Sequence, residues 1–259
     1  MDDVVELRQD GPVLTIALNR PEQHNALTPE LIERLTAVFD HYATRREIRV
    51  VVLTGNGRSF CAGADLKTMR AAADYDFAAN VADGKAIFDL VQAIDNCPKP
   101  VIGRVNGAAI GGGVGLVSVC DIIVAVERAI FAFSEARLGI VPAVIAPFVL
   151  AKIGVGNGRE LFLTGEQFDA RRAQQIGLVQ HVVAEESGLD TAVTERVEQL
   201  LLAAPDAQAA AKELIRKVAH QPTAEMRDFT ANLFARRRAS DEGREGMSAF
   251  LEKREPNWR

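Results

Sequence analysis

Two glycine-rich loops contain the backbone groups that could do chemistry in this sequence. The first loop runs from Ser59 to Lys67, and the second contains Gly111-Gly112-Gly113 before a predicted helix. Small residues let the backbone approach a ligand closely, and the first N–H groups of a helix are free to bind an anion. Two such N–H groups that converge on one carbonyl oxygen form an oxyanion hole. A tight turn with close helix packing explains a glycine cluster equally well.

Glu135 is the carboxylate most suited to proton transfer, because it lies in the otherwise apolar stretch 131–139. A carboxyl group in apolar surroundings has a raised pKa and can exchange protons near neutral pH. The alternative is a surface ion pair between Glu135 and Arg137 at the end of a strand. The spacing of these residues leaves both interpretations open.

Other catalytic motifs are absent from the sequence. Cys61 has no histidine near it, so a small packing residue is the simpler interpretation. Leu116 stands where a dinucleotide-binding loop has its third glycine, and neither a phosphate-binding Gly-Lys-Ser/Thr nor a Gly-x-Ser-x-Gly motif occurs. The four histidines are scattered, which gives a metal site little support.

Composition excludes several classes of protein. The 259 residues are 48% hydrophobic and 25% charged, as in an ordinary globular protein, and the net charge of −5 argues against a general nucleic-acid binder. The basic triplet at 236–238 is interpreted as a solvated helix face. The longest charge-free run, 105–120, is too short to span a membrane. Three cysteines without a C-x-x-C motif predict a reducing, cytoplasmic location.

The elements that must position these loops form a predicted α/β core followed by helices. A turn at 10–12 predicts a hairpin between 4–8 and 13–18, and Thr28 before Pro29 predicts a helix start. Strands are predicted at 50–53, 101–105, 122–126, 130–133 and 179–183. Helices are predicted at 77–94, 189–202, 207–218 and 224–238, and the sequence after 146 is mainly helical.

The ordered set of motifs resembles the enoyl-CoA hydratase/isomerase (crotonase) superfamily. The similar segments run nearly from end to end: Asn19-Arg20-Pro21, 25–27, 60–66, 106–113, 120–122, 133–140, 163–166, 177–179 and 249–256. The resemblance implies an α/β fold, a spiral of ββα units with a helical C-terminal trimerisation region. It implies a core at 1–190, an oligomerisation region at 191–259, and homotrimers or dimers of trimers. The expected substrate is an acyl-CoA thioester, with no metal or redox cofactor, no nucleic acid and no membrane as partner.

The resemblance also assigns roles to individual residues. Ala64 and Gly112 would supply the two N–H groups of the oxyanion hole, and Glu135 would be the general acid/base. The substrate site would contain Ala26, Ala62, Asp65, Leu66, Lys67, Gly111, Gly115 and Leu138, with Lys67 and Lys253 near the CoA phosphates.

One position departs from the family pattern. Two-glutamate hydratases carry a second glutamate where this sequence has Gly115. We expect a hydratase that acts with one glutamate, most similar to bacterial methylglutaconyl-CoA hydratases of leucine breakdown, and we expect Gly115 to leave room for a bulkier or carboxylated acyl group. A Δ3,Δ2-enoyl-CoA isomerase, which needs one base, is the alternative. A non-catalytic CoA-binding or RNA-binding protein is the third hypothesis.

Overall fold

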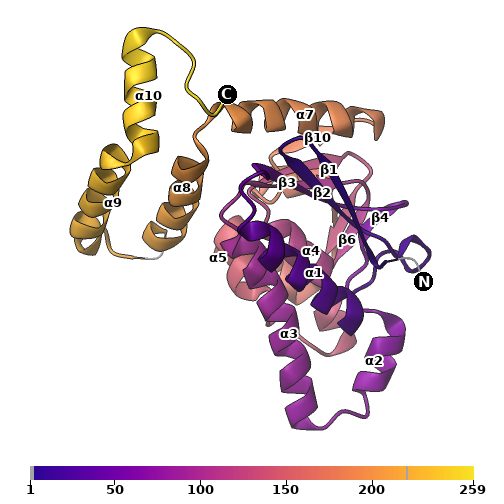
Figure 1. Cartoon of the computed structure of the whole chain (residues 1–259). Helices are drawn as coiled ribbons and strands as arrows, with labels where there is room; N and C mark the ends of the chain where they lie inside the picture. The colour runs from indigo at the N-terminus through magenta and orange to yellow at the C-terminus, as the bar shows by residue number, and fades with distance from the viewer. Residues whose placement is uncertain (1–2, 220) are drawn as a thin grey trace.

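The computed structural model describes residues 3–219 and 221–259 (Figure 1). Its larger sheet has six strands in the order β1-β2-β3-β5-β7-β10. These strands are β1 (Val5–Asp10), β2 (Val13–Leu18), β3 (Val50–Gly55), β5 (Val101–Val105), β7 (Ile122–Val126) and β10 (His181–Val183). The first two strands form the predicted antiparallel hairpin, with Val5 opposite Leu18, and every later pairing in this sheet is parallel.

A smaller sheet of four strands has the order β4-β6-β8-β9. Its strands are β4 (Ser59–Cys61), β6 (Ala108–Ile110), β8 (Ile130–Ala132) and β9 (Gln167–Asp169). Successive strand pairs divide between the two sheets: β3, β5 and β7 join the larger one, and β4, β6 and β8 join the smaller one. Because helical segments follow each pair, the chain advances as ββα units, and the expected spiral architecture is confirmed.

Helices pack around these sheets and complete the core. They are α1 (Pro29–Ala43), α2 (Leu66–Ala72), α3 (Phe77–Asn96), α4 (Gly112–Ser118), α5 (Ala146–Thr164), α6 (Ala170–Gln175) and α7 (Ser187–Leu202). Helix α1 begins as predicted, with the Thr28 hydroxyl accepting a hydrogen bond from the Leu31 N–H at 3.3 Å. Its buried residues form one apolar face, and burial of that face holds α1 on the core.

The last three helices, α8 (Pro205–Val218), α9 (Arg227–Ala239) and α10 (Asp241–Glu252), form an arm that extends from the core (Figure 1). Helix α7 instead packs on the larger sheet, beside β7 and β10. The predicted boundary at residue 190 falls within α7, and the division into two regions stays a prediction. The predicted helix at 224–238 corresponds to α9, whereas α10 was not predicted as a separate helix.

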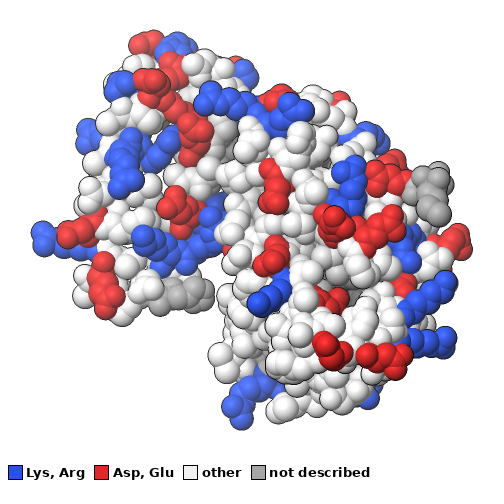
Figure 2. Space-filling model, turned by 60° about the horizontal axis from the view of Figure 1, so that its bottom comes forward, with Lys and Arg blue, Asp and Glu red and all other residues white. Residues whose placement is uncertain are grey.

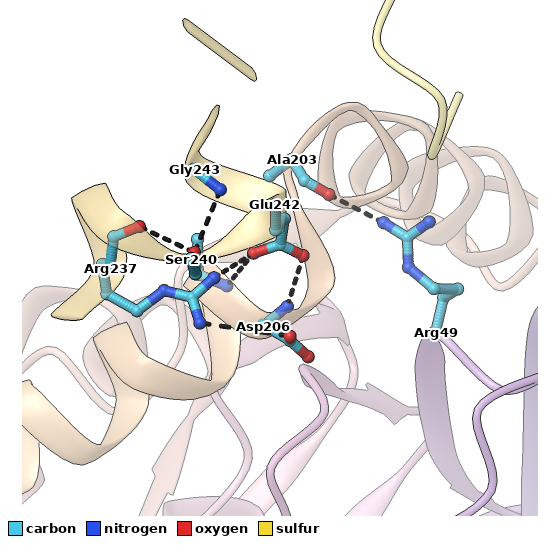
Figure 3. Close-up of polar contacts among 8 residues, drawn as sticks. Arg49, Ala203, Asp206, Arg237, Ser240, Glu242 and Gly243 are labelled. Atoms are coloured by element: carbon cyan, nitrogen blue, oxygen red, sulfur yellow. Dashed lines mark hydrogen bonds and ion pairs between the residues drawn. The ribbon is translucent and has the colours of Figure 1, made fainter. Parts of the chain in front are cut away.

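Glu242 ties the arm together (Figure 3). Its two carboxylate oxygens accept hydrogen bonds from the N–H groups of Asp206 and Ala207, at 2.9 Å each, at the start of α8. The same carboxylate pairs with Arg237 of α9. Arg237 belongs to the basic triplet that the sequence indicated to be a solvated face, so that interpretation is wrong for this residue.

Arg49 joins the arm to the core. Its guanidinium donates to the Ala203 carbonyl at 2.7 Å (Figure 3). It also donates to the Trp258 carbonyl at 3.1 Å. Positive and negative side chains are interspersed over the face shown in Figure 2. Among the described helices, none is long and apolar enough to cross a membrane.

Candidate active site

A cavity of about 340 Å³ opens between the two glycine-rich loops, helices α2 and α3, and the 3-10 helix η2 (Ser134–Leu138). Most of its lining is apolar. The residues that line it are Leu27, Ile32, Ala62, Gly63, Ala64, Leu66, Thr68, Met69, Asp83, Ile87, Ile110, Gly111, Gly112, Ser134, Glu135, Leu138, Ile140, Val141, Pro142, Val144 and Ile145. The cavity therefore brings both loops and the predicted carboxylate to one place.

The first loop presents the N–H group of Ala64. Ala64 forms a parallel bridge with Leu27, in which Leu27 donates to the Gly63 carbonyl at 2.7 Å and Asp65 donates to the Leu27 carbonyl at 3.1 Å. This pairing uses the groups on either side of Ala64 and turns its own N–H away from Leu27. Within the described residues that N–H has no backbone acceptor, so it is available to a ligand.

The second loop presents the N–H group of Gly112, the first residue of α4. Gly111 adopts a φ of +50°, which favours glycine, and turns the chain sharply from β6 into the helix. The Gly112 N–H precedes the first intrahelical hydrogen bonds and is free in the described structure. A Cβ built on Gly63 would lie only 3.6 Å from this nitrogen, which shows how closely the two loops approach.

Glu135 lies at the start of η2, directly after β8, and its carboxyl group reaches back toward the second loop. A Cβ built on Gly111 would lie 2.9 Å from Glu135 Oε1. The other oxygen, Oε2, is buried and has no hydrogen-bond partner among the described residues. Burial raises the pKa of this carboxyl group, and a hydrogen bond from its own backbone N–H opposes the shift only in part.

Arg137 does not form the surface ion pair that was the alternative interpretation of Glu135. Its Nε donates to the Thr164 carbonyl at 3.1 Å. Glu135 is left as a carboxyl group beside two free backbone donors, in a largely apolar cavity. Such an arrangement can stabilise negative charge on a carbonyl oxygen and move a proton at a neighbouring atom.

Gly115 does not leave room for substrate, and that expectation is wrong. The residue is buried inside α4, and a Cβ at this position would overlap Ile145 Cγ2 and lie 3.1 Å from Ile145 Cβ. Ile145 is itself buried and lines the cavity. The volume that a glutamate side chain would need is therefore taken by an aliphatic one.

The predicted substrate-site residues divide into two groups. Ala62, Ala64, Leu66, Gly111, Gly112, Glu135 and Leu138 line the cavity, whereas Ala26, Asp65, Lys67, Gly115 and Lys253 do not. Lys67 is exposed on α2, beside the cavity, and Ala26 is buried with its carbonyl bonded to Arg20. Lys253 ends α10 at the far end of the arm, so one chain alone does not bring it to the cavity (Figure 1).

Asp65 acts within the fold rather than in the cavity lining. Its carboxylate caps α2 by accepting from the N–H groups of Lys67 and Thr68, at 2.9 and 3.3 Å, and it pairs with Arg20 at 3.2 Å. Burial alone would raise its pKa, but these hydrogen bonds and the Arg20 charge outweigh burial and lower it. Asp65 thus fixes the segment directly after Ala64.

Sequence reasoning missed Ile87 and Val144 as cavity residues, whereas Asp83 ends the segment 69–83 that we expect from the sequence to shape part of the acyl pocket. Asp83 and Ile87 are four residues apart and face the cavity from α3, while Val144 faces it from the segment before α5. The i, i+4 spacing was visible in the sequence, but nothing there indicated which face of α3 meets the loops. Cys61 is fully buried, and burial raises the pKa of its thiol to about 12, which supports the packing interpretation.

Comparison with known proteins places this geometry in a family. Residues 8–259 match the family model described as enoyl-CoA hydratase/isomerase. The 2,3-dehydroadipyl-CoA hydratase of Escherichia coli is 35% identical over 261 residues, which cover 100% of this chain and 99% of that one. An enoyl-CoA hydratase of Alternaria alternata, AKT6-1, is 37% identical over 82% of this chain and 69% of its own.

A solved structure agrees over nearly the whole chain. The crystal structure of an enoyl-CoA hydratase from Shewanella pealeana superposes with a TM-score of 0.95 at 36% sequence identity, covering 98% of this chain and 96% of that one. The relatives are named as hydratases, so the chain is an enzyme of the same type. Full-length agreement in sequence and in fold assigns this protein to the enoyl-CoA hydratase/isomerase (crotonase) family.

Proposed function

We propose that this protein hydrates the 2,3 double bond of an enoyl-CoA thioester, with Glu135 as its single acid/base. The observation that carries the proposal is the position of the Glu135 carboxyl group in the same cavity as the free N–H groups of Ala64 and Gly112. These two donors would bind the thioester oxygen. Their interaction strengthens as negative charge develops on that oxygen in the transition state.

The reaction then needs two proton transfers, and one carboxyl group carries out both. Glu135 accepts a proton from water as the water oxygen bonds to C3, and the electrons of the double bond move toward the thioester to give an enolate. The protonated Glu135 returns a proton to C2, and the enolate collapses to the 3-hydroxyacyl thioester. A raised pKa suits both steps, because the group must accept and release a proton at similar cost. Neither step requires a metal or a redox cofactor.

Glu135 Oε2, which has no hydrogen-bond partner among the described residues, supports the acid/base role of this carboxyl group. A buried carboxylate oxygen without a hydrogen bond is costly, and a water molecule held between it and C3 would satisfy it. The proposed reaction is compatible with branched enoyl chains, including the methylglutaconyl type.

The test is the loss of absorbance at the enoyl-thioester band when purified protein is mixed with crotonyl-CoA. Glu135→Gln is expected to lower kcat by at least about a hundredfold while acyl-CoA binding survives. Loss of binding with unchanged turnover at saturation would contradict the assignment. Glu166→Gln, which removes an exposed carboxylate near η2, serves as the matched control.

Isomerisation is a second candidate, and the contact between Gly115 and Ile145 favours it. No second carboxylate stands where two-glutamate hydratases have one, and a proton shuttle between C4 and C2 requires only Glu135. A 3-enoyl-CoA supplied in water labelled with oxygen-18 separates the reactions. Isomerisation incorporates no label, whereas hydration of the 2-enoyl product does.

We also propose that the chain assembles into trimers or dimers of trimers. The arm exposes large apolar side chains, among them Phe234, Phe250 and Leu251, which are 65%, 83% and 78% exposed in the single chain. Large apolar side chains that are this exposed favour burial against other copies of the chain. Light scattering of the purified protein measures the mass directly.

A further inference from the structure

Among the residues that the structure describes, two carboxylates and no cationic side chain line the candidate cavity. Glu135 is one of them, and Asp83 of α3 is the other. Lys67, Arg70 and Lys85, the cations nearest in sequence on α2 and α3, are exposed and lie outside the lining. The remaining lining residues are apolar or uncharged, so the sign of the charge inside the cavity is negative.

Asp83 is half-buried and lies inside α3. Asp76, at the start of the same helix, caps it by accepting from the Ala79 N–H at 2.8 Å. The Asp83 carboxylate, in contrast, has no hydrogen-bond or ion-pair partner among the described residues. A carboxylate that lines an apolar cavity without a partner interacts mainly with whatever occupies that cavity.

The wall that carries Asp83 lies beside the segment that precedes α5. Gly84, the next residue of α3, approaches Val144 on the opposite segment, and its Cβ would lie 3.5 Å from Val144 Cγ1. Ile87 continues the wall one turn along the helix. An acyl chain that extends along this wall passes the Asp83 side chain.

On this basis we propose that Asp83 is the residue that determines the charge specificity of the acyl pocket, excluding chains that end in a carboxylate and accepting uncharged ones. The inference rests on the proposed function for the identity of the substrate. Two like charges within a few ångströms in a partly desolvated cavity repel each other more strongly than in water. The pocket thereby favours a neutral linear or branched chain over a methylglutaconyl or dehydroadipyl chain.

The test compares hexanoyl-CoA with adipyl-CoA, because these ligands differ only in the terminal carboxylate of a six-carbon chain. Neither carries a double bond, so binding is measured by calorimetry without turnover. Since both ligands contain the same CoA moiety, the ratio of their dissociation constants isolates the end of the acyl chain. The wild-type protein is expected to bind hexanoyl-CoA at least about tenfold more tightly.

Asp83→Asn is expected to tighten adipyl-CoA binding by about tenfold and to leave hexanoyl-CoA binding within about twofold. Asp83→Glu, which keeps the charge, should keep the preference. Asp89→Asn removes the same charge from an exposed position of α3 outside the cavity and should leave the ratio unchanged. In the wild type, kcat/KM is expected to be higher for 2-hexenoyl-CoA than for 2,3-dehydroadipyl-CoA. Asp83→Asn should reduce this preference, and Asp83→Glu and Asp89→Asn should keep it.

Equal binding of the two ligands by the wild type, or an unchanged ratio in Asp83→Asn, would overturn the inference. Crotonyl-CoA hydration tests the proposed function separately. A protein that discriminates between the two ligands but does not hydrate crotonyl-CoA would retain the charge specificity and lose the proposed reaction. A protein that hydrates crotonyl-CoA but binds the two ligands equally would retain the proposed reaction and lose the charge specificity.

Discussion

Ile145 occupies the space above Gly115 inside the core of the enzyme. A Cβ at residue 115 would overlap the Cγ2 atom of Ile145, and both residues are buried. The space that a second glutamate would need is therefore filled by the packing of α4 against the segment before α5 and is not empty. The effect of a substitution at Gly115 on stability therefore depends on the side chain at residue 145, and the reverse also holds.

Gly115→Ala is expected to destabilise the protein by about 1–3 kcal/mol, because the added methyl group has no room. Ile145→Ala creates a cavity and is also destabilising, by about 2–5 kcal/mol. The double variant should be more stable than the sum of the two effects, since each change compensates for the other. Urea unfolding of the four proteins measures this coupling, and strict additivity would contradict the contact.

The raised pKa of Glu135 predicts how activity depends on pH. As the general base for water, the carboxyl group must be ionised, so kcat/KM should fall at acid pH with a midpoint above the ordinary glutamate pKa of about 4.5. A rate profile that is flat down to that pH would contradict the role. Glu166→Gln should keep the wild-type profile.

The same shift predicts a pH-dependent difference in stability. A carboxyl group whose pKa is higher in the folded state than in the unfolded state binds its proton more tightly when folded. Its contribution to stability is complete below the unfolded pKa and is lost as pH rises through the folded value. Glu135→Gln should therefore gain stability relative to the wild type as pH rises through that window. Thermal melts of both proteins across the acid range test the sign.

Asp65→Ala is expected to lower stability by about 2–4 kcal/mol, because α2 loses its cap and Arg20 loses its carboxylate partner. It should also lower kcat more than it raises KM, since Asp65 follows the oxyanion donor Ala64 directly. Asp76→Ala removes a similar cap from α3 and should leave kcat unchanged. Equal effects of the two variants on kcat would show that Asp65 has no special positioning role.

Glu242→Ala should weaken the arm. The change leaves two N–H groups at the start of α8 without an acceptor and removes the closer of the two carboxylates that pair with Arg237, a loss of about 2–3 kcal/mol. Hydrogen exchange of α8 and α9 is expected to increase while the core sheets stay protected. Glu225→Ala, in an exposed position of the same arm, is the control. Unchanged exchange in α8 would contradict the role of Glu242.

The three cysteines should be unreactive in the folded protein. Cys61, Cys97 and Cys120 are all buried and unpaired, and burial raises the pKa of each thiol, to about 12 for Cys61 and Cys120. A thiol reagent is expected to label none of them until the protein unfolds. Labelling of Cys61 in the native enzyme at a rate matching loss of activity would contradict this prediction.

Much of the local structure follows from the sequence. The hairpin at the N-terminus, the start of α1 at Thr28 and Pro29, and the fully buried strand β3 depend on neighbouring residues and on hydrophobic periodicity, and all three were predicted. The glycine loops and Glu135 were also recognised, because residue type and order are enough to match them to a family. The division of strand pairs between two sheets was not visible, since pairing partners lie far apart in the chain.

The tertiary structure alone decided which of the predicted residues share one cavity. Asp65 was expected to line the substrate site, yet its carboxylate turns toward Arg20, which lies 45 residues earlier in the sequence. Gly115 was expected to create space, yet Ile145 fills it from a segment 30 positions further along the chain. Asp83 ends a segment that was expected to shape part of the acyl pocket, but only the packing of α3 shows that this residue lines the cavity. Composition and motif order determined the family and the reacting groups, whereas contacts between distant segments determined the shape and charge of the pocket.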